Sequence, residues 1–394
     1  MKNIGRIGRE RSRTLIGFPI KRMTAYSFPV FWPEEERGKR STMKGINDKM
    51  NPYERVMAAI AGEEPDRVPV IPAARDWCIR QAGFKFREAM ESPEKYVFSQ
   101  YYCVREFKYD AVWDLFAIHA ESEALGSKLQ IADDLPPSVI EPIVQDYSTD
   151  LPRIRLPNPY KDGRLPKLLA IISRLKELCE GHIPVLGYCQ APFRHAAMLR
   201  GLEKVLRDTK KEPENLKKLL EISLTGLIHW GIAVAEAGAD IICISDPTVS
   251  RDVMSKDTWT EFGFPFLKRL VHALKKTGKP LQLHVCGDTT DRLDTFVQAG
   301  FDILCLDTKV DFGVAREKVG DNVCLMGNVC PNTTLLFGTP EDVERDSAKV
   351  IRQAGLKSNF ILSSGCMLSP DTPKDNVHAM VNAAKTIGRY PINN

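Results

Sequence analysis

From about residue 51 to its end, the chain alternates short apolar runs with longer amphipathic stretches. The apolar runs are continuous rather than alternating with polar residues, which is typical of parallel strands buried on both faces. The predicted strands are Val68–Ile71, Asp110–Leu115, Ile183–Tyr188, Asp240–Ser245, Pro280–Cys286, Ile303–Asp307, Val323–Asn328 and Phe360–Ser364.

Helical periodicity fills most of the intervals between these runs, and glycines such as Gly238, Gly278 and Gly300 stand where a helix should end before the next strand. The predicted helices are Tyr53–Ala61, Pro93–Phe107, Lys167–Cys179, Leu202–Ala237, Lys256–Lys276, Thr290–Ala299, Phe312–Val319, Pro340–Ala354 and Pro373–Ile387. Parallel strands with helical crossovers predict an α/β fold, a (β/α)8 (TIM) barrel. A doubly wound open sheet is the alternative, but no Gly-x-Gly-x-x-Gly follows a predicted strand and no Walker A loop occurs.

The first 50 residues differ from the rest in their hydrophobic pattern and in their charge. They hold 12 Lys/Arg against 5 Asp/Glu, a charge of +7, without sustained periodicity, so we expect a basic, disordered extension at residues 1–50. The whole chain carries +4, which leaves −3 on residues 51–394. We expect those residues to form one barrel domain, and their near-neutral charge gives no indication of nucleic-acid binding.

Composition narrows the class of protein further. The 394 residues are 43% hydrophobic, and the longest apolar runs fall far short of the ~18 residues that span a bilayer, so no membrane segment is predicted. Ten cysteines without a secretory signal suggest a reducing compartment, and we expect the cytoplasm. Cysteines there serve as core residues, metal ligands or nucleophiles, and Cys243, Cys305 and Cys324 lie in buried strands as packing residues.

Polar side chains gather where the predicted strands end, which is where a barrel of this kind places its active site. His284 and Cys286 are two residues apart on one strand, so both face the same side. Cys366 follows the last strand, which approaches the fifth across the mouth of a closed barrel. An imidazole and two thiolates suit Zn²⁺ and leave one coordination position open, as in catalytic zinc sites. His-x-Cys alone is a weak signal, and the pattern also fits turn and packing residues.

Other polar residues at the predicted mouth have two possible roles. Asp246, Asp307 and Glu123 are candidates for a fourth ligand or for orienting His284, although such residues more often cap helices, anchor loops or, as for Glu123, lie solvated in a loop. Asn328 is a candidate for contacting a substrate or for anchoring a loop. We take Asp246, Asp307 and Asn328 as the candidate catalytic residues.

Several stretches between Asn51 and Pro391 resemble the uroporphyrinogen decarboxylase superfamily, and most of all its zinc-dependent methyltransferase branch, which works with methylcobamide and corrinoid proteins. The resemblance is carried by Glu54-Arg-Val, Asp66-Arg-Val-Pro-Val70, Glu123-Ala-Leu-Gly126, Leu283-His-Val-Cys-Gly-Asp288, Met326-Gly-Asn-Val329, Ser364-Gly-Cys366, Thr372-Pro373 and Asn376. The branch's zinc motif, His-x-Cys followed much later by Gly-Cys, falls on His284, Cys286 and Cys366.

Two departures separate the chain from the decarboxylases themselves. Arg80-Gln-Ala-Gly-Phe84 echoes the decarboxylases' Arg-Gln-Ala-Gly-Arg with its second arginine lost, and Asp114 lacks the Ser-Asp context of their catalytic aspartate. The resemblance therefore implies a zinc-dependent methyltransferase that moves a methyl group between a corrinoid and a small thiol or a methylated oxygen or nitrogen donor. The alternatives are a metal-free decarboxylase-type lyase acting on a tetrapyrrole, and a non-catalytic zinc or corrinoid carrier.

The cobalt cofactor is expected to arrive on a partner. No cobalamin-binding Asp-x-His-x-x-Gly segment occurs in the chain, so the cobalamin should be carried by a separate corrinoid-binding protein that docks over the barrel mouth. Two thiolate ligands lower the Lewis acidity of zinc while keeping a bound sulfur nucleophilic, which favours a thiol acceptor. The direction of methyl transfer stays open at this point.

Overall fold

The computed structural model describes residues 48–114, 119–133 and 137–392. Nearly all of the extension predicted at residues 1–50 lies outside these ranges. The main sheet has seven parallel strands in the order β1-β4-β5-β6-β7-β8-β9. They are β1 (Val112–Trp113), β4 (Val185–Gln190), β5 (Ile241–Ser245), β6 (Leu281–Val285), β7 (Ile303–Leu306), β8 (Cys324–Val329) and β9 (Phe360–Ser364).

The segment at residues 68–71 closes the sheet into a (β/α)8 barrel. Val70 bridges Leu362 of β9 in parallel, and the Val70 carbonyl accepts a hydrogen bond of 2.7 Å from the Asp110 amide just before β1. The prediction of a regular strand here is wrong, because Pro69 and Pro72 have no N–H to donate and a single bridge forms instead. The segment still occupies the eighth position of the barrel.

The helices begin and end close to the predicted residues. They are α1 (Pro52–Ala61), α2 (Arg75–Gln81), α3 (Phe86–Glu91), α4 (Pro93–Phe107), α5 (Ala120–Ala124), α6 (Tyr147–Asp150), α7 (Leu165–Cys179), α8 (Pro192–Arg200), α9 (Leu202–Lys211), α10 (Pro213–Glu236), α11 (Lys256–Thr258), α12 (Phe264–Leu274), α13 (Leu293–Ala299), α14 (Phe312–Val319), α15 (Pro340–Ala354) and α16 (Lys374–Thr386). Short 3-10 turns follow α6 and α12, and π-helical turns lie at Trp259–Gly263 and Pro331–Leu336.

One predicted helix is wrong in extent. Leu202–Ala237 is two helices, α9 and α10, because Pro213 cannot continue a helix and instead starts the next one at its first position. The region after α5 contains the antiparallel hairpin of β2 (Lys128–Gln130) and β3 (Ser138–Glu141).

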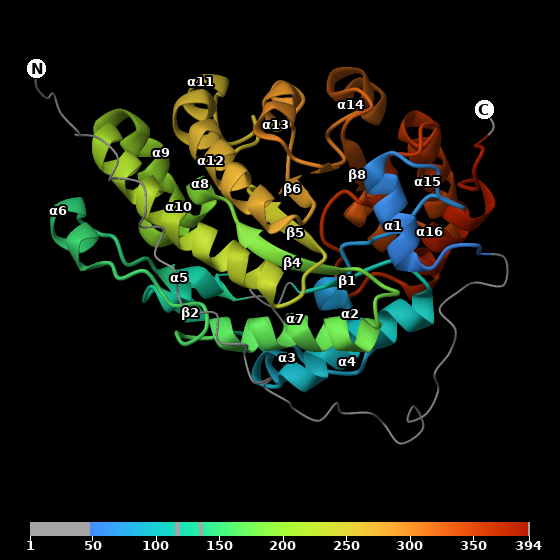
Figure 1. Ribbon diagram of the computed structural model, residues 1–394, viewed down its shortest axis with the longest axis horizontal. Helices are drawn as coiled ribbons and strands as arrows, with labels where there is room; N and C mark the ends of the chain where they lie inside the picture. The colour runs from blue at the N-terminus through green and yellow to red at the C-terminus, as the bar shows by residue number, and fades with distance from the viewer. Residues whose placement is uncertain (1–47, 115–118, 134–136, 393–394) are drawn as a thin grey trace, which may run out of the picture.

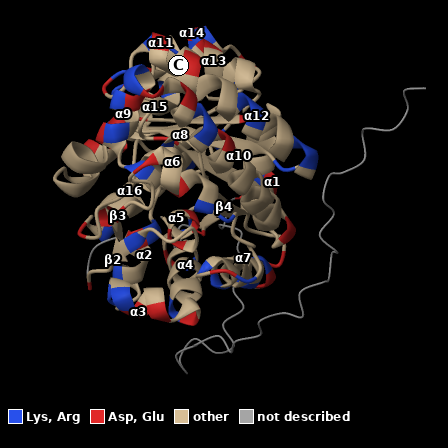
Figure 2. Cartoon of the chain, turned by 90° about the vertical axis from the view of Figure 1, so that its left-hand side faces the viewer, with Lys and Arg blue, Asp and Glu red and all other residues tan. Residues whose placement is uncertain are grey.

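The helices surround the sheet, and the two ends of the described chain meet (Figure 1). Helix α1 packs against β8 and β9, and the Val68 amide that follows it donates a 2.8 Å hydrogen bond to the Gly388 carbonyl near the other end. Acidic and basic residues are interspersed along the elements that face the viewer in Figure 2. Helix α10 is long and apolar enough to cross a membrane by length and composition alone, but 50% of that window is buried in the fold, as expected of a core helix.

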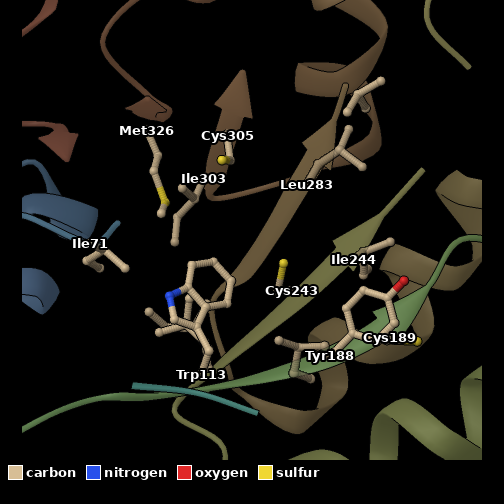
Figure 3. Packing of buried hydrophobic residues seen from close by; sticks show 14 of the residues in the cluster. Ile71, Trp113, Tyr188, Cys189, Cys243, Ile244, Leu283, Ile303, Cys305 and Met326 are labelled. Atoms are coloured by element: carbon tan, nitrogen blue, oxygen red, sulfur yellow. The ribbon is translucent and has the colours of Figure 1, made fainter. Parts of the chain in front are cut away.

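The register of the strands arranges the barrel interior in layers. Partners in neighbouring parallel strands point to the same side, so Gln190, Ser245, His284, Cys305 and Met326 form one interior layer. The layer below it contains Tyr188, Cys243, Gln282 and Ile303. Figure 3 shows several of these side chains together with Trp113. The side chains of the upper layer are polar on β4, β5 and β6, whereas β7 contributes Cys305 and β8 contributes Met326.

Candidate metal centre at the barrel mouth

Three side chains from opposite sides of the barrel converge at its mouth. His284 is the penultimate residue of β6, Cys286 follows that strand, and Cys366 follows β9. The Sγ of Cys286 lies 3.3 Å from Nε2 of His284 and 3.4 Å from Sγ of Cys366, and the Cys366 sulfur lies 3.9 Å from the same nitrogen. All three residues are partly buried. The structure thus brings together the three residues that the sequence singled out.

These distances fit a tetrahedral zinc ion. With Zn–S bonds of about 2.3 Å and a Zn–N bond of about 2.0 Å, two sulfurs lie about 3.8 Å apart and a sulfur lies about 3.5 Å from the nitrogen. The two sulfur–nitrogen separations, 3.3 and 3.9 Å, lie on either side of the expected 3.5 Å, and the sulfur–sulfur separation of 3.4 Å is about 0.4 Å shorter than that of a zinc site. They are also far too long for a disulfide bond, whose sulfurs are about 2.05 Å apart. The donor set matches Zn²⁺ in geometry and in chemistry.

One thiol, that of Cys286, and the imidazole of His284 hold protons where a cation would sit, whereas Cys366 is a thiolate. The hydrogen bond from Cys286 and the nearby His284 lower the pKa of Cys366 to about 4, despite its burial. The same contact with Cys366, followed by burial, raises the pKa of Cys286. Burial alone would lower the pKa of His284, but the sulfurs of Cys305, Cys286 and Cys366 outweigh it and raise that pKa. A divalent cation would replace these protons.

Cys305 contacts the imidazole of the candidate metal centre, which the sequence analysis did not predict. It was predicted to be a packing residue, and it is indeed 3% exposed on β7. In addition its Sγ lies 3.2 Å from Nδ1 of His284, the ring nitrogen turned away from the other two sulfurs. The contact fixes the plane of the imidazole, a role that partners of ligating histidines commonly have. The parallel register of β6 and β7 pairs these two residues directly and could have pointed to the contact.

Asp307 and Asn328 hold the loops around the cluster. The Asp307 carboxylate accepts hydrogen bonds of 2.9 Å from the Gly287 amide and 3.0 Å from the Lys309 amide. It therefore fixes the turn that follows Cys286. Asn328 donates to the carbonyls of Asp307 at 3.1 Å and Val310 at 2.7 Å. Of the two roles that the sequence left open for Asn328, these contacts are those of a loop anchor.

The other candidate carboxylates are placed differently. Asp246 is 1% exposed, its amide donates a 2.9 Å hydrogen bond to the His284 carbonyl, and burial raises its pKa to about 6. Its Oδ1 accepts hydrogen bonds from both the amide and the hydroxyl of Thr248. Glu123 on α5 forms an ion pair of 2.5 Å with Arg164, which engages the carboxylate that was a candidate fourth ligand. The decarboxylase-like Arg80 is half exposed and pairs with Asp371 on the surface.

A TIM barrel whose mouth brings one imidazole and two thiols close together has the architecture of a barrel enzyme with a candidate metal site. The uroporphyrinogen decarboxylase family model matches residues 51–387, and the chain belongs to that family. The predicted resemblance to its methyltransferase branch is confirmed by the following comparisons.

Methyltransferases are among the similar proteins. A methylcobamide:CoM methyltransferase from Methanosarcina mazei is 31% identical over 339 residues, covering 85% of this chain and 97% of its own. A solved methyltransferase structure from the same organism matches with a TM-score of 0.78 at 25% identity, covering 86% of this chain and 99% of its own. A uroporphyrinogen decarboxylase from Trichodesmium erythraeum is 28% identical, covering 85% of this chain and 96% of its own.

Proposed function

We propose that the protein is a zinc-dependent methyltransferase that transfers a methyl group from a corrinoid, carried by a partner protein, to a small thiol. The convergence of His284, Cys286 and Cys366 is the observation that supports this proposal most strongly. The similarity to methylcobamide:CoM methyltransferases supports the corrinoid as the methyl donor and a thiol as the acceptor. A cytoplasmic setting suits a chain whose ten cysteines are all free.

Each residue of the site has a defined task in this proposal. His284, Cys286 and Cys366 would hold the zinc ion, and zinc supplies a Lewis acid that keeps an acceptor sulfur deprotonated near neutral pH. Cys305 fixes the imidazole of His284, and Asp307 fixes the turn after Cys286.

The transfer itself is an in-line displacement. The acceptor sulfur attacks the methyl carbon, a C–S bond forms as the Co–C bond breaks, and cobalt keeps the electron pair as Co(I). The thiol proton is released to solvent. Such a reaction depends mainly on positioning, because both partners must approach along one line. The mouth of a barrel is suited to it, since a corrinoid carried by a partner protein can cover the opening while the thiol occupies the interior.

A spectroscopic assay tests this function directly. Zinc-loaded protein is incubated with free methylcobalamin and a thiol, and the loss of methylcobalamin and the appearance of Co(I) are followed anaerobically by absorbance. We expect thiol-dependent demethylation that falls at least about a hundredfold in Cys366→Ser, with Cys243→Ser, an interior thiol outside the cluster, as the matched control. Metal-independent decarboxylation of uroporphyrinogen, without any demethylation, would contradict the proposal and support the lyase alternative.

A further inference from the structure

Several buried polar groups around one side of the barrel mouth have no hydrogen-bond partner among the described residues. Among the described residues, buried polar atoms that lack a hydrogen-bond partner include Nε of Arg75, Oδ2 of Asp76, Oδ1 of Asp114, the Tyr188 hydroxyl and both side-chain polar atoms of Gln282. Folded proteins rarely leave such atoms unpaired, so each needs a ligand or an ordered water. On the opposite side, Asp307 and Asn328 bond to neighbouring backbone.

The unpaired groups lie beside the metal centre. Tyr188 and Gln282 belong to the interior layer directly below that of His284, and Gln282 precedes His284 by two residues on the same face of β6. Asp114 follows β1, next to β4, where its Oδ2 accepts a 3.4 Å hydrogen bond from the Tyr188 amide. Arg75 begins α2 two residues after Ala73, whose amide donates a 3.1 Å hydrogen bond to Oγ of Ser364 at the end of β9, so the start of α2 lies at the same mouth. The charge of Arg75 also acts on Asp114 and Tyr188.

Both signs of charge are present here, yet they do not neutralise each other. Arg75, Asp76 and Asp114 are 7%, 7% and 0% exposed. None of the three forms an ion pair among the described residues, although Arg75 acts electrostatically on both carboxyls. Buried charged groups are normally paired, because desolvating an unpaired charge is costly. A guanidinium with free N–H groups suits a carboxylate, and a carboxyl with a free oxygen suits an ammonium group.

We propose that the acceptor is an α-amino-acid thiol, whose carboxylate is bound by Arg75 and whose ammonium group is bound by Asp114 while its sulfur reaches the metal centre. The inference rests on the proposed function and names the substrate class of the same site. A thiol with only an anionic head would satisfy Arg75 and leave Asp114 buried without a partner. Burial raises the pKa of Asp114 in the free protein, and an ammonium group would supply the charge that lets it ionise.

A set of four thiols separates the two contacts. L-Homocysteine carries both head groups, 4-mercaptobutanoate only the carboxylate, 3-mercaptopropylamine only the ammonium group, and 1-propanethiol neither. Dissociation constants are measured by calorimetry on zinc-loaded protein, and KM is measured in the methylcobalamin assay. We expect homocysteine to bind at least about tenfold more tightly than any other member of the set, since each charge-assisted hydrogen bond is worth roughly that factor.

Two substitutions assign the contacts to residues. Arg75→Met should weaken homocysteine and 4-mercaptobutanoate at least about tenfold and leave 3-mercaptopropylamine unchanged, whereas Asp114→Asn should weaken homocysteine and 3-mercaptopropylamine and leave 4-mercaptobutanoate unchanged. Arg75→Lys, which retains the charge, replaces Arg75→Met if the latter does not fold. Arg80→Met, on the exposed face of the same helix, is the matched control. Zinc content and thermal unfolding confirm that each variant is folded.

The outcomes distinguish this inference from the proposed function. If 4-mercaptobutanoate or 2-mercaptoethanesulfonate binds as tightly as homocysteine, or if either substitution weakens all four thiols equally, the amino-acid acceptor is refuted while thiol methylation stands. If no thiol is methylated and none binds to the zinc-loaded protein, the proposed function itself fails. Product binding gives a readout without turnover, and L-methionine should bind the metal-free protein more tightly than 2-(methylthio)ethanesulfonate.

Discussion

At the scale of single residues, the partner of the ligating imidazole decides how firmly the metal is held. Cys305 contacts Nδ1 of His284 at 3.2 Å. Replacing it in Cys305→Ala should weaken zinc binding by about tenfold to a hundredfold, because the ring then loses the group that orients it. The stoichiometry should stay near one zinc per chain. Competition with a fluorescent chelator measures the affinity, with Cys243→Ala on β5 as the control; equal losses in both variants would refute a specific role for Cys305.

His195 gives a second prediction at this scale. It is 2% exposed on α8, neither ring nitrogen has a side-chain hydrogen bond among the described residues, and burial lowers its pKa to about 3. In the unfolded chain the His195 imidazole binds a proton below pH ~6.5, whereas in the native state it stays neutral down to about pH 3. The free energy of unfolding therefore falls as the pH falls from ~6.5 to about 3. Between pH 6.5 and 5 the metal-free wild type should lose ~2 kcal/mol more than His195→Gln. Urea unfolding at each pH measures this difference in the free energy of unfolding. The same pH dependence in wild type and His195→Gln would contradict the prediction.

The ligand residues could be predicted from the sequence because their signal is local. The period of a strand puts His284 and Cys286 on one face, and Cys366 stands at another strand's end. Whether Asp307 and Asn328 anchor loops or meet a substrate depended on their partners, which come from other loops. Arg75 gave no usable signal, and Asp114 was noted only beside the decarboxylases' catalytic aspartate, since a charge without a partner is recognised only in the folded chain.

At the scale of elements, the turn after β6 positions one ligand of the metal. Gly287 has a φ of +88°, and an added Cβ would lie 2.6 Å from Oδ2 of Asp252 and 2.7 Å from Oγ of Ser250. Gly287→Ala should therefore displace Cys286 and weaken zinc binding, and it should also cost ~1–3 kcal/mol of stability. Gly278→Ala is the matched control, because that glycine has a φ of +71° and open space around it. Calorimetric zinc titration should separate the two variants, and identical affinities would contradict this account of the turn.

The errors in predicting elements have identifiable causes. Most strands and helices follow the predicted ranges because apolar periodicity sets them. The segment at residues 68–71 fails as a strand because its prolines cannot donate hydrogen bonds, although its place in the barrel is as expected. The helix predicted at Leu202–Ala237 ignored the break that Pro213 imposes. Short helices such as α2 and α8 were missed because they span too few turns to show a period.

At the scale of the whole molecule, a buried ion network ties the closing segment to the barrel. Arg67 pairs with Asp110 through contacts of 2.8 and 3.0 Å, Arg55 contacts the same carboxylate at 2.7 Å, and Asp110 is 0% exposed. Arg67→Met should lower the free energy of unfolding by ~3–5 kcal/mol, because it leaves a buried carboxylate short of a partner. Arg80→Met removes the exposed pair with Asp371 and should cost less than ~1 kcal/mol. Denaturant unfolding compares the two variants. Similar losses in the free energy of unfolding would mean that the ion network does not hold the barrel closed.

The central claim is that His284, Cys286 and Cys366 together hold one zinc ion. X-ray absorption at the zinc edge on the purified, zinc-loaded chain tests it most directly. We predict about one zinc per chain, with two sulfurs at about 2.3 Å and nitrogen or oxygen neighbours at about 2.0 Å, and the loss of one sulfur in Cys366→Ser. A shell without sulfur, or a spectrum that this substitution leaves unchanged, would place the metal elsewhere and contradict the account.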